Sequence, residues 1–174
     1  RAAAAGALRE ADAISFHYGC PLKSPEETYR ELEAVVTHFR DLAERFGRGR
    51  EIPLWSTEGG TPDTTWLRGM EHPELPPRRL RPSMTWRLGA VRLVQGEVIQ
   101  QALGIEKHFY YLQNNVTPGA DAYQNTSMLD LSRAPRPKLM ARTALRNQVA
   151  GCGRPVAVRR PNGRFRSFLY PRPD

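Results

Sequence analysis

The stretch Ile52-Pro53-Leu54-Trp55-Ser56-Thr57-Glu58-Gly59-Gly60 decides the fold of this chain. It is a short apolar run that ends in one carboxylate, and two glycines follow at once. Such a run predicts a buried parallel strand that stops where the chain changes direction. Glu58 then lies at the carboxyl end of the strand, where functional side chains gather in strand-helix barrels and open α/β sheets. Glu58 is therefore the first candidate for a functional residue.

The bulk composition predicts a folded chain of about one domain. The chain has 174 residues, of which 40% are hydrophobic, and its mean hydropathy is −0.57. No apolar run approaches the roughly 18 residues that indicate a membrane span, so we expect no membrane partner. The sequence begins at Arg1 without an initiator Met or a signal-like apolar core. We expect a processed chain or a fragment of a longer one.

The net charge of +8 raises the question of an acidic partner such as nucleic acid. Most of the basic residues are arginines, and they are scattered except at 78–81 and in the last twenty residues. Because no motif that reads nucleic acid accompanies them, we expect no nucleic-acid partner. Cys20 and Cys152 are too few for a disulfide framework and lack the spacing of a zinc site.

The chain before the deciding stretch predicts one strand and one helix. Residues 12–18 are an apolar and aromatic run that reads as a buried strand. Ser24 then caps a helix over 25–46, with Glu27 completing a capping box. We expect Gly47 to end this helix in the left-handed conformation.

The rest of the chain repeats the same alternation and then changes character. After a loop over 59–82, Ser83 is expected to cap a second helix that runs to about Leu103 and is stopped by Gly104. A strand over 105–112, a loop over 113–136 and a helix over 137–149 follow. Two extended runs within 156–170 then flank Pro161-Asn162-Gly163. The Asn-Gly pair is typical of a β-hairpin turn. Strands joined by helices run parallel, so the predicted fold is α/β, with three parallel strand-helix units followed by a β-hairpin.

Strand alternation assigns side chains to the two faces of the predicted sheet. If Glu58 points away from the helices, Ser56 and Leu54 share its face. Trp55 and Thr57 then face the helices, so Trp55 is expected in the core. On the preceding strand, His17 lies at the same height as Glu58, and the two side chains are expected to approach each other.

Two interpretations of Glu58 stay open from spacing alone. As a nucleophile it must be ionised and held by hydrogen-bond donors, for which His17, Tyr18 and a tyrosine of the third strand such as Tyr111 are candidates. As a structural residue it caps a helix or pairs with an arginine. Trp66, in a long loop, is a candidate for stacking on a ligand. His17 and Tyr111 also have ordinary packing roles as alternatives.

Together these residues resemble the C-terminal part of a clan A retaining glycoside hydrolase, a family of (β/α)8-barrel enzymes. Residues 12–19 resemble the sixth barrel strand with its His/Tyr pair, 52–60 the seventh strand with its nucleophilic glutamate, and 104–111 the eighth. Residues 137–141 resemble the start of the last barrel helix. The final hairpin resembles the start of an accessory β-sandwich.

The resemblance implies a partial TIM (β/α)8 barrel over residues 1–152 and a β-hairpin over 153–174. It implies hydrolysis of a β-linked sugar or polysaccharide, with Glu58 as the nucleophile. His17, Tyr18, Tyr111 and Trp66 are the candidate substrate-binding residues. No metal or organic cofactor is implied, because the chemistry needs two carboxyl groups.

The sequence departs from the family in two ways. Tyr110 and Tyr111 stand where many members place a Trp, and no Asn-Glu pair that could carry the acid/base glutamate occurs anywhere in the chain. We therefore expect the chain alone to be inactive and prone to aggregation, with the N-terminal part of the barrel as its partner. The alternative function is a non-catalytic carbohydrate-binding or scaffold protein derived from the same barrel.

Overall fold

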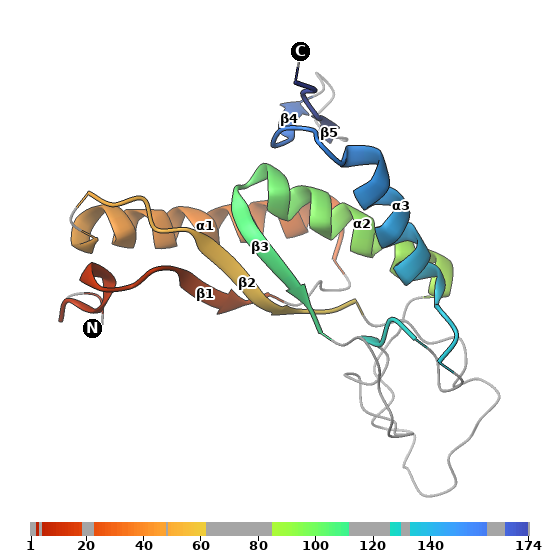
Figure 1. Cartoon of the computed structure of the whole chain (residues 1–174), viewed down its shortest axis with the longest axis horizontal. Helices are drawn as coiled ribbons and strands as arrows, with labels where there is room; N and C mark the ends of the chain where they lie inside the picture. Colours follow the sequence, from red (N-terminus) through yellow and green to blue (C-terminus); the bar gives the residue numbers. More distant parts are fainter. Residues whose placement is uncertain are drawn as a thin grey trace, which may run out of the picture.

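The computed structural model is an α/β structure with one parallel sheet and one separate hairpin (Figure 1). It describes residues 3, 5–18, 23–47, 49–61, 85–111, 126–129, 133–159 and 166–173. Its elements are η1 (Ala7–Arg9), β1 (Ile14–His17), α1 (Pro25–Phe46), β2 (Leu54–Gly59), α2 (Trp86–Ala102), β3 (Ile105–Tyr110), α3 (Pro137–Val149), β4 (Val156–Arg159) and β5 (Arg166–Leu169). The predicted α/β class and the order of strands and helices are confirmed.

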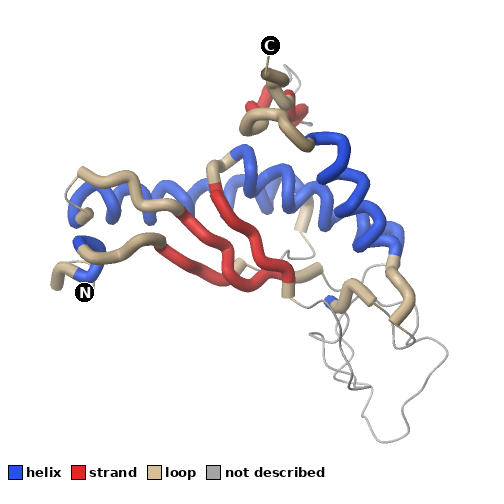
Figure 2. The backbone as a smooth tube through the Cα atoms, in the orientation of Figure 1, coloured by secondary structure: helices blue, strands red, loops and turns tan. Residues whose placement is uncertain are grey.

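The three strands β1, β2 and β3 form a parallel sheet in the order in which they occur along the chain. Helices α1 and α2 lie along one face of this sheet, and α3 packs against α2 (Figures 1 and 2). The other face, which we call the open face, carries none of the described helices. Three strand-helix units in sequential order are consistent with part of a (β/α)8 barrel.

The hydrophobic core fills the layer between the sheet and the two helices. Each strand contributes to it through the residues at its amino-terminal end, and α1 and α2 contribute one apolar face each. Its buried members are Ile14, Tyr29, Leu32, Val36, Ala43, Ile52, Leu54, Ile99, Leu103 and Ile105. Because this core closes only one face of the sheet, it fixes which side chains of each strand face the helices.

The predicted faces of β2 are wrong for three residues. Leu54 and Ser56 are buried toward the helices, whereas Trp55 lies on the open face with Glu58. The reason is a shift in register: Phe16 pairs with Ser56, but the next residue of β1 pairs with Glu58. β2 therefore contains one residue more than its neighbour, and strict alternation fails at this point.

Helix α1 begins as predicted and ends for a different reason. The Ser24 hydroxyl accepts a hydrogen bond from the backbone N–H of Glu27, whose carboxylate accepts one from the N–H of Ser24. The left-handed conformation expected for Gly47 is wrong, because its φ is −88°. Glycine is needed here for space: a Cβ would lie 2.4 Å from the carbonyl oxygen of Ala43 and 3.0 Å from Ile52.

Helix α2 begins later than predicted, at Trp86, and the Thr85 side chain accepts a hydrogen bond from the N–H of Leu88 at 3.2 Å. The predicted cap, Ser83, lies outside the described residues. Gly104 stops this helix as predicted, with φ of +77°. None of the helices in the described ranges is long and apolar enough to cross a membrane.

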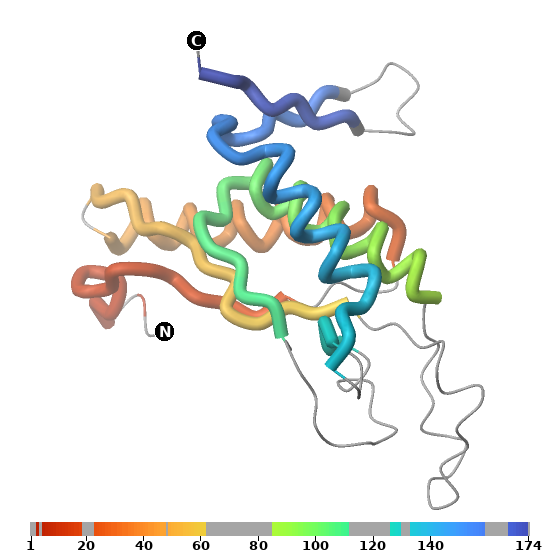
Figure 3. Tube along the Cα trace, turned by 45° about the vertical axis from the view of Figure 1, so that its right-hand side comes forward, coloured from red at the N-terminus to blue at the C-terminus, as the bar shows by residue number. Residues whose placement is uncertain are grey.

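The hairpin of β4 and β5 is antiparallel and packs against the helices (Figure 3). The ring of Phe168 is tilted against that of Tyr29 of α1, with centroids 6.4 Å apart, and the Tyr170 hydroxyl donates to Gln101 of α2 at 2.8 Å. The predicted turn at 161–163 lies outside the described residues. The division into units at 152/153 stays a prediction.

The crowding at Gly47 gives a prediction about stability. Gly47→Ala should lower the free energy of unfolding by about 1–3 kcal/mol, because the new Cβ meets backbone that cannot move freely. Gly47→Asn should do the same, although asparagine tolerates the left-handed region. Denaturant unfolding measures both. Gly153→Ala is the comparison and should cost less, since the nearest neighbour of its Cβ would be a side-chain carbon of Pro171 at 3.1 Å. A stable Gly47→Asn would contradict this account.

Candidate functional site

Glu58 and His17 form an ion-pair contact at the carboxyl ends of β2 and β1. The Nδ1 atom of His17 lies 3.3 Å from Oε2 of Glu58, and their side chains are 67% and 38% exposed. The two residues are register partners, and the N–H of Tyr18 donates to the carbonyl oxygen of Glu58 at 2.9 Å. The expected approach of His17 and Glu58 is therefore confirmed. The Glu58 side chain is partly accessible from the open face.

Three side chains cover the open face beside this pair. The Lys107 ammonium lies 4.1 Å from the centre of the Trp55 ring, which is a cation–π contact. Phe109 lies 6.5 Å from the same ring and is 48% exposed. Trp55 is thus part of an aromatic and cationic surface on the open face, not of the core as its predicted face required.

The other predicted site residues take different positions. Tyr111 follows β3 and is 40% exposed, and its N–H donates to the carbonyl oxygen of Gly59 at 2.6 Å. Tyr18 turns toward α1, where its hydroxyl donates to the carbonyl oxygen of Thr28 at 3.5 Å. Trp66 lies outside the described residues. A role in substrate binding for these three stays a prediction.

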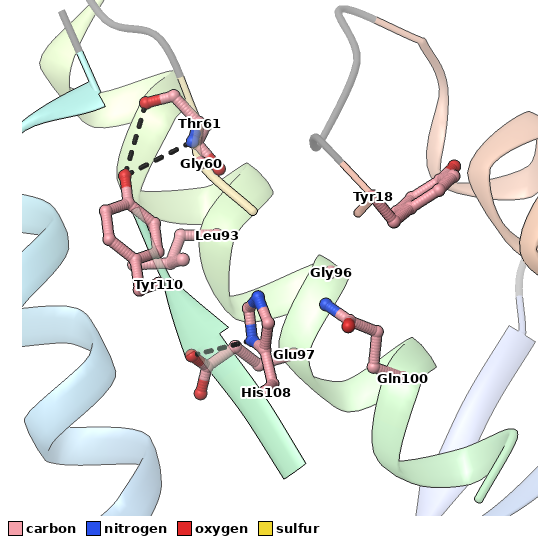
Figure 4. A pocket seen from close by; sticks show the side chains of 9 residues that line it. All are labelled: Tyr18, Gly60, Thr61, Leu93, Gly96, Glu97, Gln100, His108 and Tyr110. Atoms are coloured by element: carbon pink, nitrogen blue, oxygen red, sulfur yellow. Dashed lines mark hydrogen bonds and ion pairs between the residues drawn. The ribbon is translucent and has the colours of Figure 1, made fainter. Parts of the chain in front are cut away.

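A buried polar cluster on the helix side was not predicted. Glu97 of α2 is 3% exposed, and one of its oxygens, Oε1, lies 3.3 Å from Nδ1 of His108 (Figure 4). The same oxygen lies 2.5 Å from Nε of Arg142. The three residues come from α2, β3 and α3. These contacts have the distances of ion pairs but not the angles of linear hydrogen bonds.

Opposing effects set the pKa of Glu97. Burial raises the pKa of this carboxyl group, but the interaction with His108 and the positive charges of Arg142, His108 and Arg146 together lower it below the usual 4.5. Glu97 is therefore ionised at neutral pH. The signal available in the sequence was a single carboxylate within the mainly apolar run 88–99, and its partners are far away along the chain.

Next to this cluster, Tyr110 forms hydrogen bonds with the connection that follows β2 and with the one that follows β3. Its hydroxyl accepts a hydrogen bond from the N–H of Thr61 at 3.2 Å (Figure 4). It also donates to the carbonyl oxygen of Thr126 at 2.7 Å. The buried ammonium of Lys138 donates to the carbonyl oxygen of Thr61 at 3.1 Å. Tyr110 of β3 and Lys138 of α3 thereby hold the chain at Thr61, just after β2, and Tyr110 also holds it at Thr126.

A small pocket lies between the Glu97 cluster and the Tyr110 hydroxyl. It is lined by Tyr18, Gly60, Thr61, Leu93, Gly96, Glu97, Gln100, His108 and Tyr110 (Figure 4). Among the described residues, no group of three or more His, Cys, Asp and Glu side chains is arranged to hold a metal ion. The pocket lies on the helix side of the sheet, away from the exposed carboxylate of Glu58.

Comparison of the sequence with protein-family models and with curated proteins gives no match. Among solved structures, the chain is similar to a family 39 glycoside hydrolase from the gut symbiont Bacteroides cellulosilyticus WH2, with a TM-score of 0.67 and 14% identity. The similarity covers 98% of this chain and 34% of that one, so the chain spans about a third of the length of that protein. At this identity the similarity shows the fold alone, which is similar to part of that glycoside hydrolase.

Removing the Tyr110 hydroxyl tests its structural role. Tyr110→Phe should lower the free energy of unfolding by about 1–3 kcal/mol, because the Thr61 N–H loses its acceptor. Thermal or denaturant unfolding measures the change. Tyr111→Phe is the matched control and should change stability by less than about 0.5 kcal/mol, since Tyr111 is exposed. Equal effects of the two substitutions would contradict the role of Tyr110.

The lowered pKa of Glu97 predicts a pH-dependent contribution to stability. Its pKa in the folded state lies below the unfolded value near 4.5. Ionised Glu97 therefore stabilises the fold above about pH 4.5, and this contribution is lost as the pH falls toward the folded pKa. Glu97→Gln should cost about 3 kcal/mol at pH 7 and clearly less at pH 3.

Unfolding of both proteins across this pH range measures the difference. Glu106→Gln, at an exposed position of β3, is the control and should follow the wild type at each pH. A cost of Glu97→Gln that grows toward acid would show that the sign is wrong.

Proposed function

We propose that this chain is part of a retaining glycoside hydrolase that acts on a β-linked sugar or polysaccharide, with Glu58 as its nucleophile. The observation that carries the proposal is the position of Glu58. It lies at the carboxyl end of the middle strand, on the open face, with an imidazole 3.3 Å from one of its oxygens. The glycoside-hydrolase fold supports the assignment of this end of the sheet as the active end.

In the proposed mechanism, one oxygen of Glu58 attacks the anomeric carbon of the sugar. The bond to the leaving group breaks as a second carboxyl group donates a proton to the departing oxygen, and a glycosyl-enzyme forms. Water, deprotonated by the same second group, then releases the sugar with retained configuration. His17, through Nδ1, holds Oε2 of Glu58 and leaves the other oxygen for attack.

The second carboxyl group, which acts as acid and base, is proposed to come from the part of the barrel that precedes these strands. The chain contains no Asn-Glu pair to supply it. The open face also carries a large exposed side chain, Phe109, at 48%, which further barrel strands would cover. We propose that this barrel segment is the partner of the chain.

The substrate is proposed to bind over the carboxyl ends of the three strands. His17 and Tyr111 are exposed at this end and can donate hydrogen bonds to sugar hydroxyls. Tyr18 and Trp66 are further candidates, Tyr18 as the neighbour of His17 along the chain and Trp66 through stacking. The chemistry requires no metal or organic cofactor.

The proposal predicts a covalent adduct at Glu58. In the assembled enzyme, this chain together with the barrel segment that supplies the acid/base, an activated 2-fluoro sugar should label Glu58, as peptide mass spectrometry would show. Glu58→Gln should lower kcat by at least about 10³-fold with the fold unchanged, because the nucleophile is lost. Glu51→Gln, at an exposed position before β2, is the matched control and should keep wild-type kcat.

A second measurement separates a nucleophile from an acid/base. Glu58→Ala with added azide should release a glycosyl azide of inverted configuration, because azide attacks from the side that Glu58 has vacated. Retained configuration would assign Glu58 to the other role. Sugar binding without any adduct or turnover would support the non-catalytic carbohydrate-binding alternative instead.

A further inference from the structure

The residue after Glu58 is in contact with the buried cluster on the helix side. A Cβ on Gly59 would lie 2.9 Å from Nε2 of His108 and 2.7 Å from the carbonyl oxygen of Tyr18. The imidazole of His108 therefore packs directly against the backbone of Gly59. Glu58 itself projects to the opposite face, so His108 touches the strand end that carries Glu58 without touching its carboxylate.

Hydrogen bonds hold this strand end within the plane of the sheet. The Glu58 carbonyl oxygen accepts from Tyr18, and the Gly59 carbonyl oxygen accepts from Tyr111. These bonds fix the distances from the end of β2 to β1 and β3, but they only weakly resist movement perpendicular to the plane of the sheet. Contact with His108 from the helix side limits movement in that remaining direction.

The position of His108 is itself fixed by charge. Its Nδ1 atom faces Glu97, whose same oxygen meets Arg142. The side chains are 15%, 4% and 17% exposed, respectively. The arrangement links β3, α2 and α3 in one cluster, and His108 brings this cluster against Gly59 at the end of β2.

A cluster of this kind is not explained by stability alone. Burying a carboxylate carries a large desolvation cost before its partners compensate, and apolar residues of similar volume often stabilise a core at least as well. Charged partners differ from apolar ones in that they interact favourably in a narrow range of positions. The cluster is therefore suited to holding one imidazole in one place.

We propose that Glu97 and His108 are positioning residues, which hold the backbone at Gly59 and thereby the carboxylate of Glu58 at the height required for attack. The inference rests on the proposed function, since it assigns a role toward the proposed nucleophile. Displacement of a reacting group by about 1 Å can cost about 100-fold in rate, so the effect of losing this contact is measurable.

The test uses the assembled enzyme and two substitutions at one position. His108→Asn keeps a donor near Glu97 but loses the contact at Gly59, and it should lower kcat by about 10- to 100-fold with KM within about threefold. The rate of 2-fluoro-sugar labelling at Glu58 should fall by the same factor. His108→Gln, whose longer amide reaches the position of Nε2, should recover part of both rates.

A second variant removes the acceptor of His108 together with the charge of Arg142. Glu97→Leu with Arg142→Met replaces the ion pair by apolar groups, which cores tolerate, and it should lower kcat and the labelling rate in the same way. Val36→Ala, in the core away from the end of β2, is the control. It should lower the melting temperature but leave kcat within about twofold.

The outcomes separate this inference from the proposed function. Labelling of Glu58 at the wild-type rate in both His108→Asn and the double variant would overturn the positioning role while the proposed function stands. Absence of any adduct at Glu58 in the wild type would overturn the proposed function, and the inference with it. An equal loss of kcat in Val36→Ala would show that general loosening, not positioning, is responsible.

Discussion

The position of Glu58 depends on one extra residue in β2. Between the pairs Phe16–Ser56 and His17–Glu58, β2 has one residue more than β1, and the Thr57 hydroxyl donates to the carbonyl oxygen of Phe16 at 3.4 Å at this point. The side chains of a strand alternate between the two faces. Without the extra residue, the burial of the apolar start of β2 against the helices would turn Glu58 into the core. The extra residue lets the apolar start of β2 face the helices while Glu58 faces the open side of the sheet.

The helix side of the sheet supports this strand end through polar contacts instead of apolar packing. The apolar core packs against the amino-terminal ends of the strands, whereas Glu97, His108 and the Tyr110 hydroxyl lie with their partners toward the carboxyl ends. Such groups are expensive to bury, and each is compensated by a partner from another element. The cost is concentrated where β2 and β3 leave the sheet, which is also where strand-helix barrels place their functional residues.

The open face of the sheet is covered by aromatic and cationic side chains and by none of the described helices. Trp55, Lys107 and Phe109 form a continuous surface there, and Lys107 lies over the Trp55 ring. A parallel sheet is ordinarily covered on both faces, and the described helices cover one. The similarity to about a third of a glycoside hydrolase of known structure is consistent with this arrangement.

The sequence by itself determined the elements and their order, because hydrophobic period, capping residues and glycine stops are local signals: the helix from Pro25, the stop at Gly104 and the helix over 137–149 were all predicted. The sequence also predicted that His17 and Glu58 lie close together, because the carboxyl ends of parallel strands meet at one edge of the sheet. Only the tertiary structure decided which face of β2 is buried, because a one-residue register shift leaves no local signal. It alone joined Glu97 to His108, because that contact depends on how α2 packs on β3, and packing between distant elements is not encoded in the spacing of either one.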